Sequence, residues 1–207
     1  LKLLRDLKHR GLTFPRLTVA DGHLGIWAAC GEIHPTGTEQ RCWNHKIANV
    51  LNDLPKTVQR QAAERLKAMP YAEPQGECER RRDAFVRTYH KTDKKAVETL
   101  LRDGDRMVTF YAFPREHWRH LRTTTIVESP FSSVRLRTDA SRRYKRVAGA
   151  TAIIWKMLRV AEQAWRTLNV SELLPLVASG MTFKDGIALK SGHERNHLDH
   201  QPERTAA

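Results

Sequence analysis

The stretch "LTVADGHLGIWAACGEIHPTGTEQRCWNH", residues 17–45, decides the fold. Its first residues, 17–20, are apolar or β-branched and predict a short buried strand that an Asp-Gly turn closes. Residues 24–33 predict a helix, and residues 39–43 predict a second strand that runs into a helix ending before Pro55. Because strands and helices alternate here, the sequence predicts an α/β fold.

Helical patterns dominate the rest of the chain. From residue 56 to about residue 121 strand signals vanish and apolar residues recur at helical spacing, which predicts an all-α insertion. Two further helices are predicted after Glu128, the second and longer one over residues 147–168. The predicted organisation is 1–55 for the first part of the α/β core, 56–121 for the α-helical insertion, 122–189 for the C-terminal helices of the core, and 190–207 for a disordered tail.

The charge of the chain points to a polyanionic partner. Its 36 Lys and Arg residues exceed its 23 Asp and Glu residues, so the formal net charge is +13 and the pI is about 10.1. Nucleic acid is the leading candidate for that partner. Three cysteines do not form the framework of a secreted disulfide protein, and no apolar run is long enough to span a membrane. These features predict a cytoplasmic protein without a membrane partner.

A lone carboxylate stands in "TTTIVESPFSSVRLRT", residues 123–138. If this stretch is helical, Arg135 shares the face of Glu128. A carboxylate that binds a divalent cation beside guanidinium groups is what phosphoryl transfer on DNA requires. The alternative is that Glu128 only favours a helix N-terminus, which Ser129 caps. The local sequence leaves both interpretations open.

Two further positions have a chemical and a plain interpretation. Asp21 ends the first predicted strand, where α/β folds place ligands and metals, but Asp-Gly is also a common turn that caps a following helix. Cys42 and His45 form a C-x₂-H pair, which is half of a zinc site. The other cysteines supply no matching half, so structural zinc is disfavoured. His45, together with Lys46, is a candidate to face a phosphate near Asp21.

The segment "REHWRHLR", residues 115–122, mixes core and surface signals. Trp118 is predicted to pack in the core rather than to stack on a base. His117 and His120 are predicted at solvated helix positions.

Several motifs lie in the order and spacing of one family. They are "VADGHLGIWAACGEIHP" from Val19, "EQRCWNHKIANVLNDLPK" from Glu39, "TFYAFPREHWRHLRTTTIVES" from Thr109 with "VRLRT" from Val134, and "GMTFKDG" from Gly180. Together they span nearly the whole chain. The chain therefore resembles the catalytic region of bacterial Mutator-type transposases.

The resemblance implies a ribonuclease-H-like fold with an α-helical insertion, and a DDE triad of acids that binds two Mg²⁺ or Mn²⁺ ions. Asp21 matches the second acid and Glu128 the third, so both are expected to be catalytic and metal-binding. Cys42 and His45 match the C-x₂-H signature and are expected beside the active site. The expected DNA-contacting residues are Lys46, Arg122, Arg135 and Arg137. The implied chemistry is hydrolytic nicking at the transposon end, followed by strand transfer into target DNA.

Three departures from the family pattern shape the expected activity. The first triad acid would lie upstream of Leu1, with the leading strands, so a truncated fragment without catalysis of its own is expected. The family motif "TTNPIES" reads "TTTIVES" here, with Thr125 in place of Asn. Pro130 follows Glu128 where the family helix runs on, and is expected to disturb that helix.

Two functions from different classes remain. One is a transposase fragment, and the alternative is a non-catalytic DNA-binding or oligomerisation module derived from a transposase. The expected partners are DNA, namely transposon ends and target, and either further copies of this chain or a full-length transposase. The expected location is the bacterial cytoplasm, in association with the nucleoid.

Overall fold

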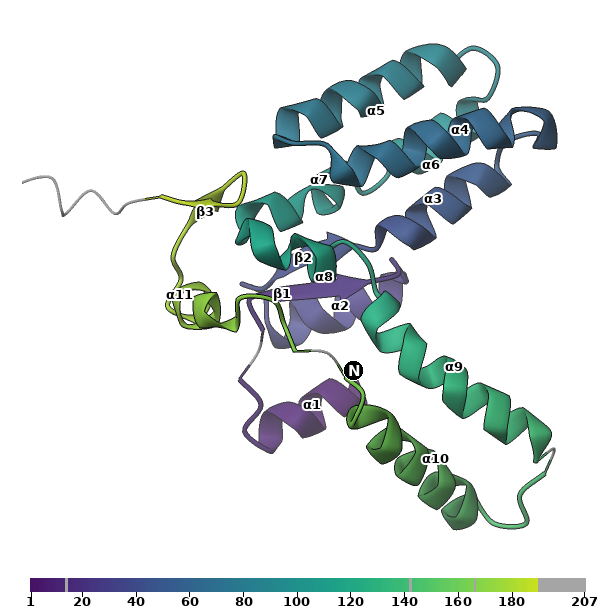
Figure 1. The fold of residues 1–207 in the computed structure, drawn as a ribbon, viewed down its shortest axis with the longest axis vertical. Coiled ribbons are helices and arrows are strands. Elements are labelled where there is room, and N and C mark those ends of the chain that lie inside the picture. The colour runs from purple at the N-terminus through teal and green to yellow at the C-terminus, as the bar shows by residue number, and fades with distance from the viewer. Residues whose placement is uncertain (14, 142, 166, 190–207) are drawn as a thin grey trace, which may run out of the picture.

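The computed structural model describes residues 1–13, 15–141, 143–165 and 167–189. This part of the chain is mostly helical and contains two small sheets of two strands each. Figure 1 shows a block of helices above a central strand pair, and a helical hairpin that projects below it. The mixed α/β class is confirmed, while the ribonuclease-H-like topology stays a prediction.

The central strand pair is a β–α–β unit. Strands β1 (Leu17–Ala20) and β2 (Thr38–Arg41) are parallel and in register from end to end. Parallel strands need a crossover connection, which helix α2 (Leu24–Ile33) provides. Helix α2 buries Trp27 and Ile33, whereas only the last residue of β1 is fully buried. The first predicted strand therefore exists but is half-exposed along most of its length.

The second strand is shorter than predicted. It ends at Arg41, and Trp43 is already the first residue of helix α3 (Trp43–Asn52). Cys42 lies between them as the N-cap residue with an extended backbone, and its amide donates to the Ala20 carbonyl at 2.8 Å. The strand ladder thus ends one residue before the chain turns into the helix.

Residues 43–107 build the main hydrophobic core. Helices α4 (Lys56–Ala68), α5 (Gln75–Tyr89), α6 (Lys94–Leu101) and α7 (Gly104–Met107) pack with α3, with a 3₁₀ turn η1 at Met69–Tyr71. In Figure 1, α3, α4, α5 and α6 form the upper block. The helical character of this region is confirmed. Its core joins side chains from both sides of the predicted boundary at residue 56, and that boundary stays a prediction.

An aromatic cluster closes the core below this block. It spans the 3₁₀ turns η2 (Thr109–Ala112) and η3 (Arg115–His117) and helix α8 (Trp118–Leu121). Trp118 is 2% exposed and meets the Phe110 ring edge-on, so its predicted core position is confirmed. The solvated position predicted for His117 is wrong. The ring is buried, and its Nε2 lies 3.1 Å from the Val170 carbonyl oxygen, which satisfies the buried nitrogen.

Helices α9 (Thr125–Ala140) and α10 (Val147–Glu162) form the projecting hairpin. Helix α9 runs through Pro130 without interruption, so the expected disturbance by that proline does not occur. Its first residue is Thr125 and Thr124 is the N-cap residue, which excludes Ser129 as the cap. Helix α10 buries none of its residues, and it ends before the predicted end at Leu168.

The remaining elements lie at the two ends of the described chain. Helix α1 (Lys2–His9) contacts α2, and Arg5 forms an ion pair with Glu32. Near the other end lie the 3₁₀ turn η4 (Ser171–Leu173), helix α11 (Leu174–Ala178), and strands β3 (Phe183–Lys184) and β4 (Ile187–Ala188). The tail predicted to be disordered, residues 190–207, lies outside the described residues.

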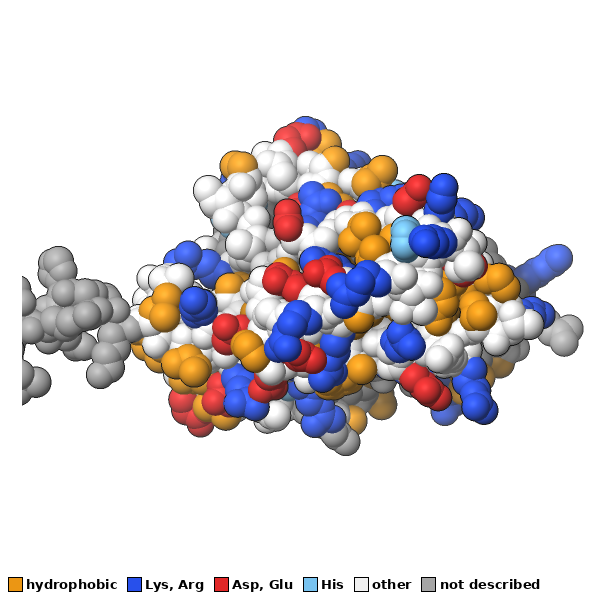
Figure 2. All heavy atoms as spheres, turned by 90° about the horizontal axis from the view of Figure 1, so that it is seen from above, with side chains coloured by type: hydrophobic (Ala, Val, Ile, Leu, Met, Phe, Trp, Pro, Cys, Tyr) orange, Lys and Arg blue, Asp and Glu red, His pale blue; other side chains and the backbone are white. Residues whose placement is uncertain are grey.

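The net positive charge is not gathered on the helical block. Figure 2 looks onto that block and shows basic, acidic and apolar side chains interspersed. In the part of the chain that the structure describes, no helix has both the length and the apolar character needed to cross a membrane.

Candidate functional site

The candidate site begins at the carboxyl end of the β1–β2 pair. Asp21 follows the last residue of β1, and Cys42 follows the last residue of β2. Those last residues, Ala20 and Arg41, are register partners, so Asp21 and Cys42 leave the sheet from neighbouring positions. Ligands of α/β folds bind at this carboxyl end of the strands, because loops rather than paired strands surround it.

Cys42 and His45 face each other across the first turn of α3. They are three positions apart in the chain, which brings their side chains to the same side of the helix. His45 Nδ1 lies 3.3 Å from Cys42 Sγ. Cys42 is fully buried, whereas the His45 side chain is 41% exposed. The pair therefore has a fixed inner member and an outer member that reaches solvent.

Thr124 connects this pair to Glu128. Its amide donates to Cys42 Sγ at 3.3 Å, and its Oγ1 lies 3.2 Å from the same sulfur and 3.5 Å from His45 Nδ1. The Thr124 hydroxyl also donates to Glu128 Oε1, and that oxygen lies 3.8 Å from His45 Nδ1. A hydroxyl has one proton, so Thr124 donates to only one of these acceptors at a time.

The segment before α9 is fixed to the start of α3 by two further hydrogen bonds. The Trp43 amide donates to the Arg122 carbonyl at 2.9 Å, and Asn44 Nδ2 donates to Thr125 Oγ1 at 3.1 Å. These bonds hold the N-terminus of α9 against the C-x₂-H turn. Glu128, in the first turns of α9, is thereby placed beside His45.

Hydrogen bonding sets the charge of the Cys42–His45 pair. Burial raises the pKa of the Cys42 thiol, but hydrogen bonds from Thr124 and His45 outweigh burial and leave that pKa below its ordinary value. The pKa of His45 is raised, mainly by its hydrogen bond to Cys42 and against the effect of burial. The negative charges of Glu128 and Asp21 raise the His45 pKa further. These shifts favour a thiolate beside an imidazolium.

Asp21 lies near this cluster but is not part of its compact centre. Its Oδ1 accepts the His23 amide at 3.0 Å, so the predicted turn is confirmed. The predicted capping role of Asp21 is wrong, because the N-cap residue of α2 is His23, whose Nδ1 accepts the Gly25 amide. Its carboxylate is exposed and near enough to His45 to raise that residue's pKa. Among the described residues, the compact group of candidate ligands consists of Cys42, His45 and Glu128, whose ligand atoms lie within 4.8 Å of one another. The turn role and a ligand role of Asp21 are compatible.

Gly22 places the Asp21 turn directly over Arg41. Gly22 has φ +89°, and a Cβ at this position would lie 2.2 Å from the Arg41 guanidinium. Only glycine allows both that backbone conformation and that approach. The turn is therefore packed on the end of β2 rather than extended into solvent.

Lys46 does not face a phosphate. It is 2% exposed, and its Nζ donates to the Thr99 carbonyl at 2.8 Å and to Asp103 Oδ2 at 3.1 Å. Asp103 Oδ2 also lies 3.7 Å from Arg41 Nε. The prediction that Lys46 contacts DNA is wrong, because its ammonium lies inside the protein and stabilises the link between α3 and the α6–α7 turn.

The three predicted arginines separate into two groups. The Arg122 guanidinium carbon lies 4.9 Å from the centre of the Tyr71 ring and 5.1 Å from that of Phe110, and burial lowers the Arg122 pKa. Arg122 is thus directed into the aromatic cluster, which contradicts its predicted contact with DNA. Arg135 and Arg137 are exposed on α9 and stay candidates for phosphate contacts.

Two residues of this region escape prediction from the sequence. Thr124 is one hydroxyl in a run of three threonines, and Asp103 is one acid in a polar turn. Asp103 has φ +68°, a conformation that Asp tolerates better than most residues, but this is visible only in the fold. The local sequence therefore gave no signal for either role.

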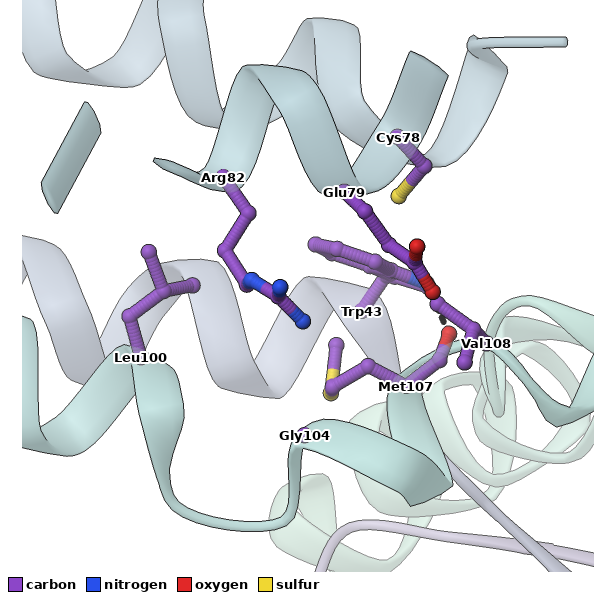
Figure 3. Close-up of a pocket in the computed structure, with 8 residues that line it drawn as sticks. All are labelled: Trp43, Cys78, Glu79, Arg82, Leu100, Gly104, Met107 and Val108. Carbon is purple, nitrogen blue, oxygen red and sulfur yellow. Dashed lines mark hydrogen bonds between the residues drawn. The ribbon is translucent and has the colours of Figure 1, made fainter. Parts of the chain in front are cut away.

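A small cavity lies in the core of the described chain. A cavity of about 10 Å³, room for about one water molecule, lies between α3, α5, α6 and α7. Figure 3 shows Trp43 and Met107 at this cavity, joined by the hydrogen bond from Trp43 Nε1 to the Met107 carbonyl at 2.9 Å. This space belongs to the core, and the Cys42–His45–Glu128 group lies elsewhere, open to the surface. An open site suits a large ligand rather than an enclosed small molecule.

Replacing Cys42 by Ser is expected to lower the pKa of His45. The largest cause of the raised pKa is the hydrogen bond to Cys42, and a serine hydroxyl does not supply the negative charge of a thiolate. Titration of the His45 ring signals by NMR measures the change. Cys30→Ser, in α2 and outside the cluster, is the matched control and leaves the His45 pKa unchanged. An unchanged His45 pKa in Cys42→Ser would exclude the thiolate–imidazolium pair.

Comparison with known proteins places the chain in a family. The model of the Mutator family of transposases matches residues 1–167. The transposase for insertion sequence element IST2 of Acidithiobacillus ferrooxidans is 42% identical over 188 residues, which are 90% of this chain and 64% of that protein. The transposase for IS6120 of Mycolicibacterium smegmatis is 40% identical over 188 residues, 91% of this chain and 58% of that protein. The chain thus spans about three-fifths of these relatives, and it belongs to the Mutator family of transposases.

Proposed function

We propose that this chain is part of the catalytic region of an insertion-sequence transposase, in which Asp21 and Glu128 bind divalent metal ions for cleavage and transfer of DNA strands. The proposal includes a ribonuclease-H-like arrangement around β1 and β2. It rests on family membership and on the convergence of two separate segments at the carboxyl end of the strand pair.

The single observation that carries the proposal is the connection made by Thr124. Its amide donates to Cys42 Sγ, next to the end of β2, and its hydroxyl donates to Glu128 on α9, so a carboxylate that follows the helical block in the chain lies beside the residues at the end of the strand pair. Without that contact Glu128 would be a surface acid on a projecting helix.

The donors at this edge fit Mg²⁺ or Mn²⁺. Such ions are commonly bound by one or two carboxylates, with water and substrate phosphates completing the coordination. Asp21 and Glu128 are exposed carboxylates, and the negative charge of each raises the pKa of His45. When bound, divalent ions in such a site activate the attacking oxygen and stabilise the leaving oxygen of a phosphoryl transfer.

The chain's own residues would orient the substrate. Thr124 holds the Glu128 carboxylate by a hydrogen bond, and a protonated His45 offers a positive charge at the exposed rim of the site. Arg135 and Arg137 lie on the same helix as Glu128 and are exposed to solvent. Guanidinium groups on this helix would bind backbone phosphates and align the strand along α9.

When Mn²⁺ is added to the protein in an NMR titration, it is expected to broaden the signals of residues next to Asp21 and of residues next to Glu128. Paramagnetic broadening reports metal proximity without requiring catalysis, and excess Mg²⁺ is expected to reverse it. Asp21→Asn and Glu128→Gln should each weaken the effect at both segments. Asp139 is an exposed acid on the same helix as Glu128, so Asp139→Asn is the matched control and should leave the broadening at both segments unchanged. Broadening spread evenly over exposed acids would contradict the proposed site.

Binding and cleavage assays with a labelled DNA duplex distinguish the catalytic proposal from the alternative, a non-catalytic DNA-binding module. The polypeptide of residues 1–207 carries two of the three acids implied by the resemblance, so we expect it to bind DNA without cleaving it. Binding should weaken with salt, and Arg135→Ala should reduce the salt slope by about one. Metal-dependent cleavage that Glu128→Gln abolishes would show that the polypeptide is active by itself. Binding that ignores salt would contradict phosphate contacts.

The α9–α10 hairpin favours assembly as a second role. It exposes several large apolar side chains, namely Ile126, Val127, Phe131, Leu136, Val147, Ile153, Trp155 and Val160. Exposed apolar surface of this kind marks interaction sites. A further copy of this chain or a longer transposase is the partner we propose, and sedimentation of the purified protein measures the association.

A further inference from the structure

The atoms around Thr124 form a compact group of four potential metal ligands. Cys42 Sγ lies 3.3 Å from His45 Nδ1, which lies 3.8 Å from Glu128 Oε1. The fourth atom, Thr124 Oγ1, lies 3.2 Å from the sulfur and 3.5 Å from the nitrogen, and it hydrogen-bonds the carboxylate oxygen. The ligand atoms of Cys42, His45 and Glu128 all lie within 4.8 Å of one another.

These separations are close to those of a tetrahedral zinc site without yet matching them. With metal–ligand bonds of about 2.0–2.3 Å, the ligand atoms of a tetrahedral site lie roughly 3.3–3.6 Å from one another. The Cys42–His45 separation already lies in this range, whereas Glu128 Oε1, on a half-exposed side chain, has to move closer to His45 Nδ1. A water or hydroxide from solvent would complete the coordination, and Thr124 Oγ1 would hydrogen-bond the ligands rather than bind the ion.

The donor set selects a different metal from Mg²⁺. Thiolate and imidazole ligands suit zinc and similar thiophilic ions, whereas Mg²⁺ prefers oxygen ligands alone. A cysteine, a histidine and one carboxylate with a fourth open position is the pattern of an accessible zinc site rather than a closed structural one. The sequence disfavours zinc for lack of a second ligand pair, but the third ligand comes from a distant helix.

The site is both held in place and accessible. Cys42 is fixed at the N-cap of α3 by hydrogen bonds of its backbone and sulfur, so the inner ligand needs no rearrangement. The side chains of His45 and Glu128 are 41% and 50% exposed, so an ion can enter from solvent. The group thus combines one buried ligand with two that solvent reaches.

We propose that Cys42, His45 and Glu128 bind a thiophilic divalent ion of the zinc class. Binding uses the Cys42 thiolate, the unprotonated His45 Nδ1 and the Glu128 carboxylate, and any protons on these ligands pass to solvent. One consequence rests on the proposed function. The Glu128 carboxylate cannot bind a zinc-class ion and Mg²⁺ at the same time in one geometry. Zinc bound to Glu128 would therefore prevent Mg²⁺ from binding this carboxylate and would inhibit strand cleavage.

Cobalt substitution tests the site directly. Co²⁺ added to the full chain is expected to produce the near-ultraviolet charge-transfer band of a cobalt–thiolate bond and the intense visible bands of tetrahedral coordination. Stoichiometric Zn²⁺ should then displace Co²⁺ and remove both. The thiolate band is the decisive signal, because the chain has 10 histidines that could bind cobalt but only three cysteines.

Matched variants assign the ligands. Cys42→Ser should abolish the thiolate band, whereas Cys30→Ser, on α2, should keep it. Because Cys42 is buried and its replacement could disturb folding, His45→Gln and Glu128→Gln at exposed side chains give a second assignment. Each should weaken Co²⁺ binding at least about tenfold, since even outer contacts of metal ligands have effects of that size. Absence of the band in the unmodified chain, or a band that none of these ligand variants changes, would overturn the proposal.

A competition experiment separates this inference from the proposed function. Zn²⁺ should reverse Mn²⁺ broadening near Glu128 in the unmodified chain but not in Cys42→Ser. If Co²⁺ binds Cys42 and Mn²⁺ broadens neither Asp21 nor Glu128, the zinc-class site stands and the transposase metal site fails. If Mn²⁺ broadens both segments and no cobalt–thiolate band forms, the transposase metal site stands and the zinc-class site fails.

Discussion

Replacing Asp103 by Asn is expected to lower the free energy of unfolding by about 3–5 kcal/mol, the usual effect of removing one partner from a buried ion pair. Asp103 Oδ2 lies 3.1 Å from Lys46 Nζ and 3.7 Å from Arg41 Nε, and these cations have side chains that are only 2% and 5% exposed. Without the carboxylate, two buried positive charges face each other uncompensated. Asn tolerates the left-handed backbone at this position, so the substitution isolates the effect of charge.

The size of this effect depends on the protonation of Lys46. Burial already lowers the Lys46 pKa, and Asp103 opposes that shift. In Asp103→Asn the opposition is lost, so Lys46 releases its proton more readily and the loss of stability moves toward the lower end of the range. Urea unfolding followed by circular dichroism measures it. Asp105→Asn, an exposed acid two residues away, is the matched control and should change stability by less than about 0.5 kcal/mol. Equal stability of both variants would contradict the role of the ion network.

Replacing Trp118 by Ala is expected to lower the free energy of unfolding by about 3–5 kcal/mol, as for other buried large aromatic residues. Trp118 meets the Phe110 and Tyr111 rings edge-on at centroid distances of 5.4 and 4.8 Å, and its Nε1 donates to the Phe113 carbonyl at 2.8 Å. Its removal leaves a cavity in the aromatic cluster and an unsatisfied carbonyl.

Replacing Trp118 by Ala should also change the hydrogen bonds of the candidate site. Arg122 stacks over Trp118 and its carbonyl accepts the Trp43 amide, two residues before Thr124. Loosening this segment weakens the hydrogen bonds of Thr124 to Cys42, so the pKa of the Cys42 thiol should rise toward its ordinary value. Thermal unfolding and the pH dependence of thiolate absorbance provide the two measurements. Trp165→Ala, at a 57% exposed position after α10, is the control and should change neither the thermal unfolding nor the Cys42 pKa. An unchanged Cys42 pKa in a clearly destabilised Trp118→Ala would show that the site is independent of the aromatic cluster.

Local geometry explains which parts of the fold were predictable. The β–α–β order, the helices of residues 56–101 and the long helices after Glu128 follow from apolar spacing and from turn residues, which act over a few positions. The C-x₂-H pair was also readable, because residues three apart meet on one helix turn wherever that helix packs. Errors fell at element ends, where a single hydrogen bond decides between strand and helix.

Errors about exposure had a different cause. Lys46 and Arg135 are both basic residues on helices, and the sequence assigns both to a phosphate-binding surface. The fold places Lys46 against Asp103 in the interior and leaves Arg135 in solvent. His117 is likewise buried against a carbonyl from a remote turn. Burial of a charged or polar group depends on partners that lie far away in the chain, and composition does not reveal them.

The sequence by itself therefore determined the kinds of element, the acids and the C-x₂-H signature, and through them the family. Only the tertiary structure decided that Thr124 joins Cys42, His45 and Glu128 into one group, and that Asp103 holds two buried cations beneath it. The physical reason is the distance along the sequence over which each kind of interaction acts. Helix and turn formation act between near neighbours in sequence. A site of side chains from the β2–α3 junction, α3 and the start of α9 exists only after the whole core has packed and fixed their separations.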